Sequence, residues 1–101
     1  MNRIVERFAR LNRERQKGFI VYLGAGDPNL EATRQLALAL DQLGVDVLEL
    51  GVPFSDPLAD GVVNQLAAQR GLDSGTTPSR LLATVAAIRR DSQIPIVLYV
   101  Y

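Results

Sequence analysis

Three carboxylates follow one another closely in the sequence, and carboxylates can give and take protons. Glu49 lies near the end of an apolar run, and Asp56 and Asp60 follow in a loop rich in proline and glycine. An ionised carboxylate costs several kcal/mol to bury unless it is paired, so an acid with apolar neighbours on both sides needs a reason to be there. The stretch 47–61 therefore holds the best candidates for acid–base chemistry, with Glu49 first among them.

Each of these residues also has an ordinary structural explanation. Glu49 could pair with a lysine or arginine elsewhere in the fold. The two aspartates stand in Ser-Asp-Pro and Ala-Asp-Gly, which are common turn sequences in which aspartate bonds its own backbone. Ser55 lies in the same loop, but the chain has no histidine to activate a hydroxyl, so we expect a turn or capping role.

The composition removes several classes of function. The 101 residues include no cysteine and no histidine, which excludes disulfides, thiolate nucleophiles and metal sites built from thiolates or imidazoles. Eleven basic and eleven acidic residues cancel, so no net charge favours nucleic acid. The clustered acids could bind Mg²⁺, but their spacing is not specific to a metal. Acid–base chemistry therefore falls to Asp, Glu, Lys or Tyr.

No apolar run approaches the roughly 20 residues that a membrane-spanning helix needs. The first fifteen residues alternate charged and isolated apolar side chains, without the continuous apolar segment of a secretory signal. We expect a cytoplasmic, soluble protein.

Helical and strand patterns alternate along the chain. The predicted helices follow Asn2, cover about 30–43, begin at Val62 and begin at Pro78; the predicted strands are 19–23, 45–50 and 94–101. The order helix, strand, helix, strand, helix, helix, strand predicts an α/β fold with a parallel sheet and right-handed crossovers. Glu49 then lies at the carboxyl end of the second strand, where α/β proteins bind their ligands.

The apolar spacing also predicts which residues face the core and which residues cap the helices. We expect core-facing stripes of Ile4, Phe8 and Leu11, of Leu36, Leu40 and Leu43, and of Leu81, Leu82, Val85 and Ile88. We expect Arg3, Glu6, Arg7, Arg10 and Arg13 to face solvent. The predicted caps are Asn2, either Asp27 or Asn29, and Thr77, with Pro28 and Pro78 in first turns.

A dinucleotide-binding loop is not supported. Gly24-Ala25-Gly26 follows a predicted strand, but the fingerprint requires a third glycine where this chain has Asn29.

One long motif carries a family resemblance. The run Leu48-Glu49-Leu50-Gly51-Val52-Pro53-Phe54-Ser55-Asp56-Pro57-Leu58-Ala59-Asp60-Gly61, followed by Gln65, resembles the signature of the tryptophan synthase alpha subunit family. Gly26-Asp27-Pro28 and Gly75-Thr76-Thr77 agree with that family's pattern. The chain departs from it at Gly24, Val62 and Asn64, beside the predicted site.

The resemblance implies a TIM barrel that cleaves indole-3-glycerol phosphate to indole and glyceraldehyde 3-phosphate. It implies that Glu49 is the catalytic acid/base and Asp60 the second catalytic carboxylate. It also implies that Tyr22 and Tyr101, at strand ends, flank the indole ring of the substrate; ordinary core packing is the alternative for these two tyrosines.

The resemblance also implies a partner. The family's alpha subunit associates with a beta subunit that contains pyridoxal phosphate, so no cofactor is expected in this chain. The loop Pro53–Asp60 resembles the segment that communicates with the beta subunit, and indole would pass between the two proteins.

The length of the chain bears on how much of the fold and of the activity we expect. A TIM barrel takes about 250 residues and eight strands, so we expect residues 1–101 to be a partial barrel domain, an N-terminal fragment with a leading helix and three strands. Such a chain should have little or no lyase activity alone. Two alternatives are a non-catalytic module that associates through open sheet edges and a related phosphate-sugar barrel enzyme that uses Mg²⁺.

Overall fold

The computed structural model describes residues 2–101 and contains helices and strands in the predicted order. The elements are α1 (Arg3–Arg13), β1 (Ile20–Gly24), α2 (Leu30–Gln42), β2 (Val47–Gly51), α3 (Val62–Asp73), α4 (Pro78–Arg89) and β3 (Ile96–Tyr99). Each strand is shorter than its apolar run or shifted along it, because part of each run lies in the connection before or after the strand. No helix among these residues is both long enough and apolar enough to cross a membrane.

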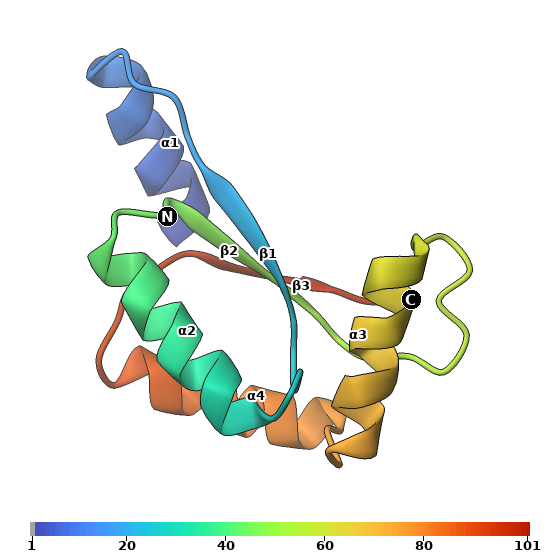
Figure 1. Cartoon of the computed structure of the whole chain (residues 1–101). Coiled ribbons are helices and arrows are strands. Elements are labelled where there is room, and N and C mark those ends of the chain that lie inside the picture. The colour runs from blue at the N-terminus through green and yellow to red at the C-terminus, as the bar shows by residue number, and fades with distance from the viewer. Residues whose placement is uncertain (1) are drawn as a thin grey trace.

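The three strands form one parallel sheet in the sequential order β1-β2-β3. The connection from β1 to β2 contains α2, and the connection from β2 to β3 contains α3 and α4. Figure 1 shows α2 and α4 side by side, with α3 apart from them near the C-terminus. All strands therefore present their carboxyl ends at one edge of the sheet, and the loops that follow β1 and β2 meet there.

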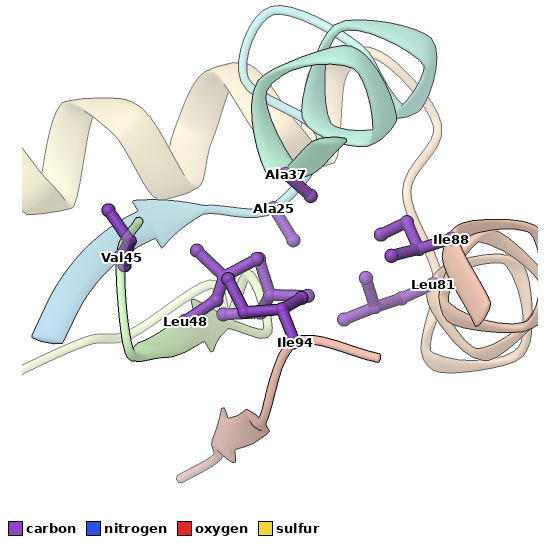
Figure 2. Packing of buried hydrophobic residues seen from close by; sticks show 8 residues of the cluster. Ala25, Ala37, Val45, Leu48, Leu81, Ile88 and Ile94 are labelled. Carbon is purple, nitrogen blue, oxygen red and sulfur yellow. The ribbon is translucent and has the colours of Figure 1, made fainter. Parts of the chain in front are cut away.

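The core lies between the sheet and the pair α2 and α4. Leu48 and Leu50 are fully buried on one face of β2, and Leu81 and Ile88 of α4 reach toward them from the other side. Figure 2 shows Ile88 and Leu81 directed at Leu48 and Ile94, with Ala37 of α2 above. Burying a leucine or isoleucine side chain is worth about 1.5–3 kcal/mol, so this layer contributes much of the fold's stability.

Three of the predicted helix caps are confirmed. The side chains of Asn2, Asn29 and Thr77 each accept a hydrogen bond from the backbone N–H three residues later. These bonds satisfy N–H groups that the first turn of a helix leaves without partners. Pro78 occupies the first turn of α4 as predicted. The prediction for Pro28 was wrong, because Asn29 is the cap and Pro28 precedes it.

The predicted core stripes are only partly correct. In α2 the buried residues are Thr33 and Ala37, whereas Leu36 is half exposed and Leu43 is 80% exposed. In α4, Leu81 and Ile88 are buried but Leu82 is exposed. Ala37 belongs to the core cluster, and Leu38 and Leu40 of the same helix are partly buried against it.

The leading helix lies at the amino ends of the strands (Figure 1). Its Leu11 is buried, but Phe8 is 40% exposed rather than in the core. Arg7 is also not at the solvent face: its guanidinium donates to the Asp46 carboxylate at 3.2 Å, just before β2. The other Asp46 oxygen accepts the Phe19 N–H at 2.8 Å. This aspartate therefore joins α1, the start of β1 and the start of β2.

Candidate active site

Glu49 lies on the sheet face opposite to the core. In the strand register it is flanked by Tyr22 of β1 and Val97 of β3. Its neighbours Leu48 and Leu50 point into the core and are fully buried, whereas Glu49 is half-buried. None of the ion pairs within residues 2–101 includes Glu49. The structural alternative, a paired Glu49, has no support in this part of the chain.

Asp60 ends the loop between β2 and α3, one residue before Gly61, the residue that precedes the first turn of α3. Its backbone N–H donates to the Pro57 carbonyl at 3.0 Å, and its own carbonyl accepts the Gln65 amide at 2.9 Å. Its backbone thus closes a turn, and its half-buried side chain lies with Tyr22 and Tyr101 around a small cavity. Asp56 is exposed, and its carbonyl accepts the Leu58 N–H at 2.9 Å, which fits the turn explanation for this residue.

Four aromatic rings gather at the carboxyl ends of the strands. The rings of Tyr22 and Tyr99 meet edge to face with centroids 6.3 Å apart, and those of Tyr99 and Tyr101 do so at 5.6 Å. Phe54 stacks on Tyr101 at 5.5 Å. Such pairs add roughly 0.5–1.5 kcal/mol to the energy of burial. The two predicted tyrosines are therefore joined through a third, Tyr99.

Tyr99 and Phe54 were missed at the level of sequence. Tyr99 precedes Tyr101 by two residues, and residues two apart in a strand share a face. This spacing is a signal that could have found Tyr99. Phe54 lies in a loop, where no periodicity predicts the direction of a side chain.

Two glycines in the strands make room for this cluster. A Cβ placed on Gly51 would lie 2.0 Å from the Tyr22 hydroxyl oxygen, so only glycine lets that hydroxyl lie over β2. A Cβ on Gly24 would come within 3.3 Å of the Ala67 side chain of α3. The tyrosine hydroxyl therefore requires glycine at position 51, whereas at position 24 a Cβ would make only a tight contact with α3.

The electrostatics tie both predicted carboxylates to the tyrosines. Burial raises the pKa of Tyr22, and the negative charges of Asp60 and then Glu49 raise it further. Loss of surrounding water also raises the pKa of Tyr101, with additional contributions from the Tyr99 hydroxyl and the Asp60 carboxylate. Asp60 thus lies within electrostatic reach of both tyrosines, and Glu49 lies within reach of Tyr22.

The space enclosed by these residues is small. A cavity of about 10 Å³ lies among Tyr22, Gly51, Phe54, Asp60, Tyr99 and Tyr101, with the rest of its wall from the neighbouring loops. One water needs roughly 10–15 Å³ of such volume, so the cavity has no room for a bicyclic ring. A wider groove, about 690 Å³, lies at the other end of the fold along the arginines of α1. That groove is remote from both site carboxylates.

No metal site is evident in the described part of the chain. Within residues 2–101, no three or more Asp, Glu, His or Cys side chains are grouped so that they could hold a metal ion. Asp46 lies just before the amino end of β2 and binds Arg7, whereas Asp60 lies in the loop that follows the carboxyl end of β2. The site is thus a cluster of two carboxylates and four aromatic rings on a glycine-lined sheet end.

Comparison with known proteins identifies related sequences. The family model described as "Tryptophan synthase alpha chain" matches residues 8–101. The tryptophan synthase alpha chain of Opitutus terrae is 52% identical over all 101 residues, and that of Geotalea daltonii is 48% identical. In both cases the match covers 38% of the relative, so the chain spans well under half the length of these curated relatives.

Solved structures agree with the sequence comparison. The tryptophan synthase subunit alpha of Legionella pneumophila str. Paris superposes on the whole chain with a TM-score of 0.96 at 41% identity, over 39% of that protein. A chain of M. tuberculosis tryptophan synthase in an aminoacrylate-bound form gives a TM-score of 0.90 at 31% identity, over 41% of its length. The parallel three-strand sheet and its helices are therefore the N-terminal portion of a TIM (β/α)8 barrel.

Proposed function

Since the chain belongs to the tryptophan synthase alpha chain family, we propose that the protein carrying it acts in tryptophan biosynthesis as a lyase. The proposed reaction is the cleavage of indole-3-glycerol phosphate to indole and glyceraldehyde 3-phosphate. The observation that carries the proposal is geometric: Glu49 lies beside Tyr22 in the strand register, and Tyr22, Asp60 and Tyr101 line one cavity at the carboxyl end of the sheet.

Glu49 is the proposed acid/base. Cleavage of the bond between indole C3 and the glycerol side chain needs a proton delivered to C3, and it needs the adjacent glycerol hydroxyl to lose its proton as the carbonyl forms. A single carboxyl group can perform both transfers, which leaves its protonation state unchanged over the cycle. The position of Glu49 supports this role, because it is half-buried and forms no ion pair within residues 2–101.

Asp60 is the proposed charge stabiliser. Protonation of C3 places positive charge on the indole ring, and an ionised carboxylate that accepts a hydrogen bond from the indole N–H stabilises that charge. Such stabilisation is greatest where the carboxylate is already held in place. The backbone bonds of Asp60 to Pro57 and Gln65 hold it in this way.

Tyr22 and Tyr101 are the proposed walls of the indole pocket, and Tyr99 joins them. Flat aromatic faces suit a bicyclic aromatic substrate. Phe54 stacks on Tyr101, and the cavity beside them is only about 10 Å³. We expect Phe54, on the loop, to move away when substrate binds.

The proposed partner is a beta subunit with pyridoxal phosphate, and the reaction of this chain needs no cofactor of its own. The loop Pro53–Asp60 is the proposed contact with that subunit. The exposure of Phe54 and Leu58 supports this, because apolar loop side chains in solvent are suited to burial against another protein.

The experiment uses the full-length protein that carries this segment and measures indole release from indole-3-glycerol phosphate. Asp60→Asn should lower kcat by at least about 100-fold, because one preorganised electrostatic contact is worth that much. The matched control is Asp73→Asn, which changes an exposed carboxylate at the end of α3 whose side chain bonds only Gln69 within residues 2–101. Equal kcat values for the two variants would refute the role of Asp60.

A second candidate function rests on the exposed sheet. Ile20, Val97 and Val100 are partly or largely exposed, and β1 and β3 each pair only with β2 within residues 2–101. Unpaired strand edges recruit further strands. The 101-residue chain alone would then be a non-catalytic module that associates with itself, with little or no turnover of indole-3-glycerol phosphate.

A further inference from the structure

The carboxyl-terminal half of α3 is fixed to the loop between β1 and α2. Arg70 donates from Nε to Asp27 Oδ1 at 2.8 Å and from Nη2 to Oδ2 at 2.9 Å, which is a two-pronged ion pair. The Ser74 hydroxyl lies within hydrogen-bond distance of two carbonyl oxygens, that of Gly26 in the loop at 2.9 Å and that of Gly71 in the helix at 2.8 Å. A Cβ on Gly71 would come within 2.7 Å of the Ala25 carbonyl oxygen, so helix and loop are in direct backbone contact there.

Asp60 lies in the loop just before the opposite, amino-terminal end of α3. Val62 and Val63, in the first turn, are 70% and 77% exposed, so the amino-terminal part of the helix has little packing of its own. The Gln65 side chain bonds the Asp60 carbonyl, which links the loop end to the helix. Arg70 and Asp60 are thus connected through α3 and the bond between the Gln65 side chain and the Asp60 carbonyl.

We propose that the Asp27–Arg70 pair is a positioning element of the active site, which acts through α3 to hold the Asp60 carboxylate against Tyr22 and Tyr101. Its part in the reaction rests on the proposed lyase function. Its effect on the geometry of Asp60 is independent of that function.

The exposure of the pair indicates positioning rather than stability. The Arg70 side chain is 55% exposed and that of Asp27 is 21% exposed, and exposed ion pairs add little to folding stability. A planar guanidinium that meets both carboxylate oxygens nevertheless fixes direction, which a lysine cannot do. The pair therefore restrains the direction of α3 while adding little to the free energy of folding.

The test compares Arg70→Lys with Arg34→Lys. Arg34 forms a two-pronged pair with Glu31 on α2, at 3.0 and 2.6 Å, so the control removes the same bond type away from the site. Tyrosine ionisation is followed by ultraviolet absorbance as pH rises. Arg70→Lys should move the titration of Tyr22 and Tyr101 toward the ordinary value of 10.0, because Asp60 no longer lies against them. Arg34→Lys should leave it unchanged.

In the full-length protein, Arg70→Lys should lower kcat about tenfold with KM and the urea unfolding midpoint nearly unchanged. Exchange of the charges in Asp27→Arg with Arg70→Asp should restore part of both readouts. Unchanged titration and kcat in Arg70→Lys would overturn the proposal. Changed titration in a protein whose unaltered form releases no indole would support the positioning and refute the lyase function instead.

Discussion

At the scale of single residues, the site depends on a glycine as much as on its acids. Gly51 lies in β2 beside Glu49, yet its contribution is the space it leaves for the Tyr22 hydroxyl. The sequence motif draws attention to Glu49 and Asp60 because carboxylates can transfer protons and stabilise positive charge. The structure shows that both lie near Tyr22. The hydroxyl of this tyrosine occupies the space that a side chain on residue 51 would take.

Gly51→Ala should therefore destabilise the protein and displace Tyr22. Overpacking of this kind costs about 1–3 kcal/mol, measurable as a lower free energy of unfolding in urea. Combination with Tyr22→Phe should recover part of the loss, since the hydroxyl makes the closest contact. Gly61→Ala is the control, because nothing lies within 4 Å of its added Cβ. A Gly51→Ala protein as stable as this control would contradict the packing described.

Tyrosine ionisation should make stability fall at alkaline pH. The pKa of Tyr22 is raised in the fold, so the folded chain holds its proton above pH 10.0, where the unfolded chain loses it. Stability is then lost progressively as pH rises past that value. Urea unfolding between about pH 9 and 11 should show a shallower loss in Tyr22→Phe than in the parent. An identical slope in the two proteins would argue against a partly desolvated Tyr22 that faces the two carboxylates.

At the scale of elements, strands and caps could be predicted, and burial could be predicted only in part. Asn2, Asn29 and Thr77 cap their helices because a cap depends on residues within one turn. Leu43 and Leu82 are exposed although their spacing fits a core stripe, because the covered face depends on neighbouring elements. Local sequence cannot report those neighbours.

The site residues also divide into those that the sequence could indicate and those that only the structure reveals. Glu49 could be recognised because the acid interrupts an apolar strand. Tyr99, Phe54 and the Asp27–Arg70 pair required contacts between segments far apart in the chain. Residues 27 and 70 have no sequence pattern in common, and only the close approach of α3 to the first loop brings them together.

Asp46 gives an element-scale prediction, because it joins α1, β1 and β2. Asp46→Ala would leave the Phe19 N–H and the Arg7 guanidinium without this partner. Removing one partner of such buried groups costs about 1–3 kcal/mol or more. Asp46→Asn should lose less, since its amide oxygen can still accept the Phe19 N–H. Equal unfolding free energies for Asp46→Ala and the parent would show that the junction contributes nothing.

At the scale of the whole molecule, the sheet has one covered and one open face. The core of Leu48, Leu50 and Ile88 holds α2 and α4 against one side. The face that carries Glu49 and Tyr22 is contacted by α3 near Gly24 and is otherwise more open, with Ile20 and Val97 partly exposed. In a complete barrel this face turns inward, where side chains fill the interior. The chain, which spans 38% of its relatives' length, supplies one arc of that wall.

The 101-residue chain alone should associate with itself in a concentration-dependent manner, as measured by light scattering. Val100→Lys should weaken association, because lysine at a strand edge opposes pairing, and Val100 is exposed just beyond β3. Leu43→Lys is the control, since Leu43 is exposed at the end of α2, away from both strand edges. A strictly monomeric chain at all concentrations would refute the self-associating module.

The most direct test of the central claim is the effect of Glu49→Gln on indole release by the full-length protein. Glutamine keeps the shape of the side chain but cannot transfer the proton. We predict that kcat falls by at least about 100-fold, with the affinity for indole-3-glycerol phosphate and the unfolding free energy nearly unchanged. A kcat close to that of the parent protein would remove Glu49 from the acid–base role and contradict the account.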